Sequence, residues 1–302
     1  MPWKIRQYKD EDEDQVIDLI KLVYGLSEFR DFYRWMVKSN PNSHGKIYLA
    51  LDNENIIGHY LVVPRRRKIE NDIIIDGEAV WAAVHPNYRK QGIFTELGIY
   101  ALNDIQNEIP VCTGFPNIYA IQGHLKVGWH FFDIPLLKLT VKNKFNKKDN
   151  TFMHKGEFGI EFDEFWKKIS KDYSNIVVRD ASYLNYRYFH KPIDYEIRVI
   201  RDEEILGFVV LKKYFDKSHI VDILAIDDVI LSELLVASIN FAIKNESKIL
   251  SCIMMKDKFY YDSLLSHGFD DREKKLFIYH TNREDFKMPK EYFITMGDWD
   301  VF

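Results

Sequence analysis

The stretch HPNYRKQGIFTEL, residues 85–97, decides the fold because it joins two different patterns. An alternating apolar run ends at Val84, and helix-forming residues follow from Thr95. Pro86 is typical of a chain that leaves a sheet, since proline cannot donate to a strand ladder. Gly92 permits a positive φ or a close approach of the backbone to a ligand. The sequence therefore predicts a loop between a strand and a helix.

This loop has the composition of an anion-binding site. The backbone N–H groups of residues 91–95 are predicted to lie at a helix N-terminus, where unpaired donors and the helix dipole attract negative charge. Arg89 and Lys90 add positive charge beside them. Strand-to-helix turns often contain glycine and proline without any ligand, so the loop alone leaves a phosphate cradle and a basic surface loop open.

The order of the patterns around the loop favours the phosphate cradle. Alternating residues predict strands, and an apolar period of 3.6 residues predicts helices. Before the loop, the predicted segments are a strand at 3–9, helices at 9–25 and 29–38, and strands at 46–52, 55–63 and 71–84, the last interrupted by a turn at the DG pair 76–77. After it, they are a helix at 95–108, a strand at 110–115, a helix at 117–128 and a strand at 129–141.

In this context the loop resembles the acyl-CoA loop of the GNAT acyltransferase superfamily. The family pattern is Q/R-x-x-G-x-G/A preceded by V-x-P, and it is matched here by Val84, Pro86, Arg89 and Gly92. Phe94 stands at the last position, where the family usually has a small residue. The fit of that last turn is therefore a question for the structure.

The resemblance covers the chain from its start to about residue 140. It implies an α/β fold of the mixed α+β kind, with a mostly antiparallel twisted sheet flanked by helices, and acetyl-CoA or another acyl-CoA as co-substrate, without a metal. The residues implied in acyl-CoA binding are Val84, Arg89, Lys90, Gln91, Gly92, Ile93, Phe94, Thr95 and Asn117.

A second family element follows in the next predicted helix. At the family's spacing of Asn, Ala, Tyr, Gly and an aromatic residue, this chain has Asn117, Ala120, His124, Gly128 and Trp129. The family's Tyr commonly protonates the departing thiolate. A histidine can do the same, since its ordinary pKa is near 6.5. A lone His on an amphipathic helix is nevertheless more often a packed residue.

The remaining catalytic candidates are assigned through the same resemblance. Tyr119 is the alternative acid. Glu78, near the start of the strand that ends at Val84, is the candidate base, directly or through water, although a carboxylate on the sheet surface without a catalytic role is equally compatible. A backbone N–H of that strand would polarise the thioester carbonyl. Asn117 is expected either to cap its helix or to bond the pantetheine arm.

The second half of the chain repeats features of the first. Four pairs of residues share an offset of 140 positions: Cys112 and Cys252, Asn117 and Asp257, Gly128 and Gly268, and Trp129 and Phe269. We therefore predict a duplicated GNAT-like domain at 161–302, joined to the catalytic domain at 1–142 by a polar linker at 143–160.

The second copy lacks the chemistry of the first. Its strand and helix are joined through Asp227 and Asp228, without Arg, Lys or Gly, and Leu264 replaces His124. Two carboxylates at a helix N-terminus suit capping and would repel a pyrophosphate. The second copy is therefore expected to shape the acceptor site without binding acyl-CoA.

Composition limits the compartment and the partners. The net charge of −4 over 302 residues gives no general attraction to nucleic acid. No apolar run approaches the roughly 18 residues of a membrane span, and the first residues do not form a signal peptide. We expect a cytoplasmic protein that binds neither nucleic acid nor membrane. Cys112 and Cys252 lie in apolar runs and are expected to be buried rather than paired or metal-bound.

Two further segments have a structural and a functional interpretation. The RRRK run at 65–68 is predicted to be a solvated strand end rather than a phosphate site. In the C-terminal segment, Asp298 and Asp300 are candidates for contact with a cationic amine, whereas Trp299 and Phe302 favour simple docking onto the protein. Docking is the preferred interpretation.

Three functions stay open from the sequence. The first is an N-acyltransferase that acts on the primary amine of a small molecule by direct transfer in a ternary complex. The second is a Fem-type transferase that uses aminoacyl-tRNA, which would favour a more basic face or an added helical arm. The third is a non-catalytic acyl-CoA-binding or scaffold module, which Phe94 and His124 keep open.

Overall fold

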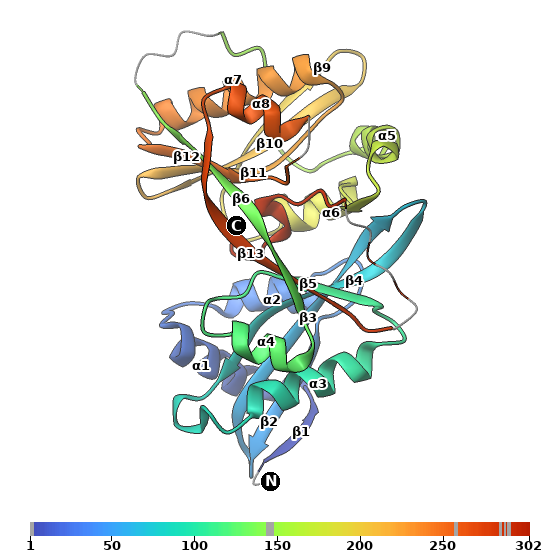
Figure 1. Cartoon of the computed structure of the whole chain (residues 1–302), viewed down its shortest axis with the longest axis vertical. Helices are drawn as coiled ribbons and strands as arrows, with labels where there is room; N and C mark the ends of the chain where they lie inside the picture. Colours follow the sequence, from blue (N-terminus) through green and yellow to red (C-terminus); the bar gives the residue numbers. More distant parts are fainter. Residues whose placement is uncertain (1–2, 143–147, 257–258, 284–285, 287, 289–290) are drawn as a thin grey trace. The chain divides into compact units, whose positions relative to one another are not determined.

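The computed structural model describes residues 3–142, 148–256, 259–283, 286, 288 and 291–302. The chain divides into two compact units (Figure 1). Unit 1 consists of Met1–Arg67, Ile73–Phe132 and Leu276–Met288, and unit 2 of Lys68–Asp72, Asp133–Lys275 and Pro289–Phe302. Each unit is a mixed sheet with helices packed on it, as the sequence predicts.

Unit 1 contains the loop at 85–97. Its strand order is β1-β2-β3-β4-β5-β13-β6, and β4 pairs with β5 in parallel. Its strands are β1 (Lys4–Gln7), β2 (Lys46–Asp52), β3 (Asn55–Ile69), β4 (Asp72–Val84), β5 (Val111–Gly114), and parts of β6 (His130–Thr140) and β13 (Asp270–Thr281). Its helices are α1 (Glu13–Tyr24), α2 (Arg30–Lys38), α3 (Ile93–Ile105) and α4 (Ile121–Val127), with short 3₁₀ turns at Asp10–Asp12 and Pro86–Tyr88.

The two faces of this sheet carry different helices, because successive strand residues point to opposite faces. On β3, Gly58 faces α3, and a Cβ added there would lie 2.8 Å from Leu97 Cδ1. The next residue, His59, contacts Tyr33 of α2. Helices α3 and α2 therefore cover opposite faces, and the close approach of α3 requires glycine at position 58.

Unit 2 has the strand order β13-β6-β12-β11-β10-β9-β7, and β11 pairs with β12 in parallel. The remaining strands are β7 (Phe152–His154), β8 (Asn175–Val177), β9 (Glu196–Arg201), β10 (Ile205–Tyr214), β11 (Lys217–Ala225) and β12 (Ile249–Ile253). The helices are α5 (Ile160–Ile169), α6 (Ala181–Leu184), α7 (Asp228–Lys244) and α8 (Tyr260–Ser266), with a π-helical turn at Asn185–Phe189 and 3₁₀ turns at Ser170–Asp172 and Met296–Asp298.

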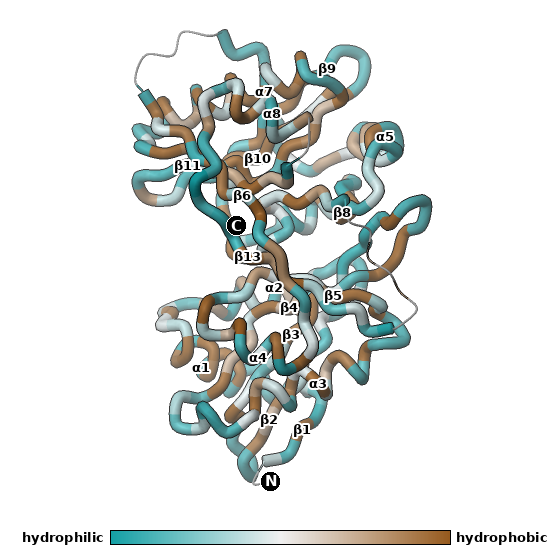
Figure 2. Tube along the Cα trace, viewed as in Figure 1, coloured by the Kyte–Doolittle hydropathy of each residue, from teal (hydrophilic) through white to brown (hydrophobic). Residues whose placement is uncertain are grey.

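The packing of unit 2 repeats that of unit 1. Helix α7 is largely hydrophobic (Figure 2), and its Ile230 and Leu234 lie against Gly207 of β10, as α3 lies against the glycine of β3. The next residue, Phe208, contacts Phe162 of α5 on the other face. Both sheets therefore have a glycine that faces one helix, followed by a residue that faces the helix on the other side: Gly58 and His59 on β3, and Gly207 and Phe208 on β10.

One backbone hydrogen bond fixes the correspondence between the two sheets. His85 N donates to Ile57 O (2.9 Å) just after β4, and Ile226 N donates to Leu206 O (3.1 Å) just after β11. Residues of β11 thus correspond to residues of β4 that lie 141 positions earlier. The predicted duplication is confirmed in the structure.

The paired positions predicted from the sequence agree with this duplication where they are described. Cys112 and Cys252 are buried free cysteines in β5 and β12. Gly128 and Gly268 follow α4 and α8 with φ of 99° and 91°. Asp257 lies outside the described residues.

The two units are not consecutive segments of the chain, unlike the predicted domains 1–142 and 161–302. In unit 1, residues 278–281 of β13 pair with β5 in antiparallel fashion. In unit 2, residues 136–140 of β6 pair with β12. Strands β6 and β13 each run from one unit into the other, so each half of the chain completes its sheet with a strand that belongs mainly to the other half.

Two local predictions are corrected. Asp76 and Gly77 do not form a turn, because β4 is continuous; a Cβ at Gly77 would lie 2.4 Å from Val62 Cγ1, so the glycine serves packing. In the segment 143–160, predicted to be a linker, β7 pairs with β9 and α5 begins, while residues 143–147 lie outside the described residues.

Candidate active site

The loop between β4 and α3 has the predicted strand-to-helix geometry. Gly92 caps α3 with φ of 96°, and Lys90 is also left-handed with φ of 65°. The first intrahelical hydrogen bond runs from Glu96 N to Gly92 O (3.1 Å), so the preceding N–H groups lie at the helix start. The segment 89–92 is exposed, which leaves its cations and glycine accessible to a dissolved anion.

Phe94 is accommodated by a glycine that the sequence did not single out. Its ring lies over Gly123 of α4, where an added Cβ would be 2.4 Å from Phe94 Cδ1. The ring also makes edge contacts with Tyr60 (6.2 Å between centroids) and His124 (5.0 Å). The large residue in the last position of the loop motif therefore packs into a gap in α4.

His124 lies in an aromatic environment. It is 7% exposed, and its ring contacts Phe94 and Trp129 at centroid distances of 5.0 and 5.1 Å. Nδ1 is buried, and no hydrogen-bond partner for it is found among the described residues. Burial lowers the pKa of His124 to about 4, so the imidazole is neutral at pH 7 and an imidazolium is not available there as a proton donor.

The other two residues of the α4 region differ in exposure. Asn117 Oδ1 accepts hydrogen bonds from the N–H groups of Tyr119 and Ala120, both at 3.0 Å, which is the capping role. Tyr119 is 90% exposed at this turn, so its phenol is open to solvent. Of the two candidate acids, Tyr119 is the accessible one.

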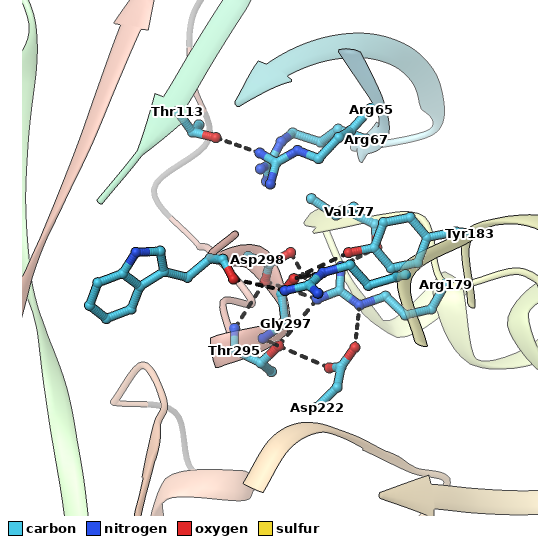
Figure 3. Close-up of polar contacts among 12 residues, drawn as sticks. Arg65, Arg67, Thr113, Val177, Arg179, Tyr183, Asp222, Thr295, Gly297 and Asp298 are labelled. Carbon is cyan, nitrogen blue, oxygen red and sulfur yellow. Dashed lines mark hydrogen bonds and ion pairs between the residues drawn. The ribbon is translucent and has the colours of Figure 1, made fainter. Parts of the chain in front are cut away.

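Glu78 belongs to a buried charged cluster. Arg65 on β3 donates to Glu78 Oε2 (3.1 Å), to Asp76 Oδ2 (2.9 Å) and to Thr113 Oγ1 of β5 (2.6 Å), the last drawn in Figure 3. Arg67 also bonds Asp76 Oδ2 at 2.8 Å. Burial alone would raise the pKa of Asp76, but the two guanidinium groups outweigh it and the pKa is lowered.

The prediction of a solvated strand end at 65–68 is wrong for two of its residues. Arg65 and Arg67 are 4% and 1% exposed. Their partners come from neighbouring strands, and this pairing could not be seen in the local sequence. The cluster lies where β4 parts from β5, since Glu78 opposite Thr113 is the last parallel pair.

Beyond this point β4 contains an irregular residue that the sequence did not reveal. Trp81 has φ of 51°. Its ring packs against Tyr24 of α1 and Phe29 next to α2, with centroids 5.0 and 4.5 Å away. A positive φ is unusual for a bulky residue and marks a local departure from regular strand geometry.

In the corresponding region of unit 2, side chains engage the backbone N–H groups. Asp227 caps α7 by accepting from Ile230 N (2.8 Å), as predicted for this carboxylate. Tyr260 OH lies 3.1 Å from Ala225 N, at the end of β11. A cavity of about 610 Å³ adjoins this strand end, lined by Tyr260, Phe259 and Met255 among others.

The C-terminal segment docks within unit 2, as the preferred interpretation predicted. Arg179 donates to both carboxylate oxygens of Asp298 (2.9 Å) and to Asp222 (3.1 Å), as Figure 3 shows. Arg187 donates to Trp299 O (2.7 Å) and Lys191 to Asp300 O (2.9 Å). Asp298 is buried and ion-paired with Arg179 inside the unit.

Comparison with known proteins gives a family match for residues 4–132 and fold matches for most of the chain. Residues 4–132 match the acetyltransferase (GNAT) domain family. No curated protein matches the chain. In the described part of the chain, no helix combines the length and apolar character that a membrane crossing requires.

Solved structures share the fold over most of the chain. A GCN5-related N-acetyltransferase from Anabaena variabilis ATCC 29413 has a TM-score of 0.72 at 10% identity, with 93% of this chain and 73% of that chain covered. A probable N-acyltransferase from Enterococcus faecalis V583 gives 0.68 at 12% identity, with 93% and 73% covered. The Saccharomyces cerevisiae N-myristoyltransferase with bound myristoyl-CoA gives 0.63 at 10% identity, with 93% and 83% covered. These matches confirm the predicted tandem GNAT-like fold.

Proposed function

Since residues 4–132 form a GNAT acetyltransferase domain, we propose that the protein is an acyl-CoA-dependent N-acyltransferase. Acetyl-CoA is the proposed donor, and the primary amine of a small molecule is the proposed acceptor. The amine nitrogen attacks the thioester carbon directly, the C–S bond breaks, and the thiolate leaves as CoA after it takes up a proton. The nitrogen loses one proton to a base or to water.

The observation that supports this proposal best is the loop between β4 and α3. The N–H groups of residues 91–95, with Arg89 and Lys90, would hold the donor's pyrophosphate at the N-terminus of α3. Phe94 does not obstruct this role, because its ring packs toward Gly123 rather than standing free in the loop. Val84 and Asn117 flank the proposed path of the pantetheine arm.

The proton transfers are assigned to Tyr119 and Glu78. Tyr119 is the proposed donor to the thiolate because its phenol is exposed, whereas His124 is buried and neutral. Glu78 is the proposed base, and the ion pair with Arg65 holds its carboxylate in place. Substitution of Tyr119 by Phe should therefore lower kcat more than substitution of His124 by Phe.

Ligand binding to the full chain tests the proposal. Acetyl-CoA and free CoA should each raise the melting temperature of the wild type, and Gly92→Trp should abolish this rise by filling the cradle. Gly156→Trp is the matched control, because Gly156 also has a positive φ (89°) and lies in unit 2. Stabilisation of Gly92→Trp equal to that of the wild type, or no response of the wild type, would contradict the donor assignment.

A thiol-release assay over a panel of amines then separates catalysis from binding. Release that depends on an amine supports the transferase. Stabilisation by CoA without release from any amine would favour the non-catalytic acyl-CoA-binding alternative. The same assay with acetyl-CoA and myristoyl-CoA measures the preferred acyl chain length.

A further inference from the structure

The irregular part of β4 is held by a chain of buried polar groups. His59 Nδ1 lies 2.9 Å from the carbonyl oxygen of Trp81, and Tyr33 OH lies 3.3 Å from His59 Nε2. His59 is 1% exposed and Tyr33 is fully buried. At the next residue, Tyr24 OH donates to Ala82 O at 2.9 Å. The backbone at Trp81 and Ala82 is thus fixed by side chains from α1, α2 and β3.

The protons of this chain can be assigned. Burial lowers the pKa of His59 to about 4, so its ring is neutral and carries one N–H at pH 7. The Trp81 carbonyl can only accept, so this N–H must be on Nδ1. Nε2 is then an acceptor, and Tyr33 OH donates to it. The Trp81 carbonyl therefore fixes the tautomer of His59, and Tyr33 completes it by donating to the remaining ring nitrogen.

The geometry of the peptide bond carries the consequence to the next residue. In a trans peptide, the C=O and the N–H of the following residue point in opposite directions. The hydrogen bond that directs Trp81 O toward His59 therefore directs Ala82 N–H away from it. This N–H belongs to the length of β4 beyond its parallel pairing with β5, which ends at Glu78.

We infer that His59 is a positioning residue, which acts with Tyr33 to fix the peptide between Trp81 and Ala82 so that Ala82 N–H polarises the thioester carbonyl of the donor. This inference rests on the proposed function and adds a specific donor and the residues that orient it. A fixed N–H stabilises the developing oxyanion because it needs no reorganisation during the reaction. The hydrogen bond accepted by Trp81 O also polarises the same peptide group and strengthens its N–H as a donor.

Unit 2 has lost this arrangement together with the cations and glycine of the loop. In unit 2, Phe208 corresponds to His59. Asp222 and Ile223 correspond to Trp81 and Ala82. Phe208 cannot donate a hydrogen bond. Ile223 N donates instead to Asp222 Oδ1 (3.1 Å), so the N–H that corresponds to Ala82 is engaged by a carboxylate that would repel an oxyanion. Strand β11 lies wholly within the described residues, and none of its residues has a positive φ.

Carbon-13 NMR of acetyl-CoA labelled at the carbonyl tests this inference on the full chain. In the wild type, the bound carbonyl resonance should move downfield from its position in free acetyl-CoA, because the oxygen accepts a hydrogen bond. His59→Leu should reduce this shift by at least half. His59→Asn should retain it, since its side-chain amide can replace Nδ1 as a donor. Affinity for free CoA, measured by calorimetry, should stay within about twofold in all variants, because the pyrophosphate contacts are unchanged.

The outcomes distinguish a positioning role of His59 from a purely structural one. A full downfield shift in His59→Leu would overturn the inference. If His59→Leu does not fold, Tyr33→Phe takes its place: a reduced shift supports the inference and an unchanged shift overturns it. Binding of acetyl-CoA to the wild type without any carbonyl shift overturns this inference alone. Failure of the wild type to bind either acetyl-CoA or CoA overturns the proposed function, and this inference with it.

Discussion

At the scale of single residues, burial changes the chemistry expected of His124. The sequence placed it where the family has a tyrosine, and an ordinary imidazole would be partly protonated at neutral pH. In the structure the ring is enclosed by Phe94 and Trp129 and stays neutral. Its contacts are those of a packed aromatic residue.

The pH dependence of stability should reveal this role of His124. Its folded-state pKa of about 4 lies below the unfolded value near 6.5, so its contribution to stability is complete above pH 6.5 and is lost as the pH falls toward 4. His124→Phe removes this loss and should gain about 2 kcal/mol relative to the wild type between pH 7 and pH 5. Urea unfolding at the two pH values measures the difference, with the exposed His44→Phe as control. Equal pH dependence in wild type and His124→Phe would contradict the burial of a neutral ring.

At the scale of elements, helices α3 and α4 fit together through a large residue and a glycine. Phe94 occupies the space over Gly123, and a few residues further Gly98 faces Val127, where an added Cβ would lie 3.0 Å from Cγ2. The size of Phe94 is therefore compensated on the neighbouring helix. This explains how the loop motif can carry a large residue in its last position.

A double substitution tests this compensation. Gly123→Ala should destabilise the protein, because overpacking costs about 1–3 kcal/mol and outweighs the gain in helix propensity of at most about 1 kcal/mol. In a Phe94→Ala background the clash is absent, so the same Gly123→Ala change should become stabilising. Chemical denaturation of the four proteins measures the sign in each background. The same sign in both backgrounds would show that Phe94 does not fill the gap at Gly123.

Local patterns predicted the elements better than they predicted their partners. The strands predicted at 46–52 and 129–141 are found at Lys46–Asp52 and His130–Thr140, and the loop before α3 was predicted from its proline, glycine and cations. The burial of Arg65 depends on carboxylates from β4 and a hydroxyl from β5, which no local pattern contains. The hydrogen bond from His59 to the Trp81 carbonyl is likewise made between residues that are distant in the sequence.

At the Asp76–Gly77 pair, by contrast, the local pattern itself predicted the wrong structure, a turn in place of a continuous strand. A DG pair between apolar residues is a strong turn signal in isolation. Here tertiary packing prevails, since Gly77 is required by Val62 and Asp76 is held by two arginines. The general position of the candidate site could therefore be predicted from the sequence, whereas the groups that orient its backbone could not.

At the scale of the whole molecule, the exchange of strands makes each unit depend on both halves of the chain. Strand β5 would keep β4 on one side but lose its partner on the other if the chain ended before β13. A strand that is unpaired along one side exposes a row of backbone donors and acceptors. The first half therefore carries the loop at 85–97 but not a complete sheet.

Separate expression of the two halves tests this dependence. The fragment 1–142 should show no cooperative unfolding transition and no stabilisation by CoA, because the residues 278–281 that pair with β5 are missing. Coexpression with the fragment 143–302 should restore both properties. Circular dichroism and thermal shift measurements compare the fragments with the intact chain. A fragment 1–142 that unfolds cooperatively alone would contradict the structural role of β13.

The crossing of β13 into unit 1 also sets a minimum time for that unit to form in the cell. Its partner strand β5 leaves the ribosome 164–170 residues before the paired residues of β13 do. At ordinary rates of about 5–20 residues per second, the first sheet would wait roughly 8–30 seconds with one edge open during translation. An N-terminal domain commonly folds first during synthesis, but here unit 1 can be completed only after β13 has been synthesised.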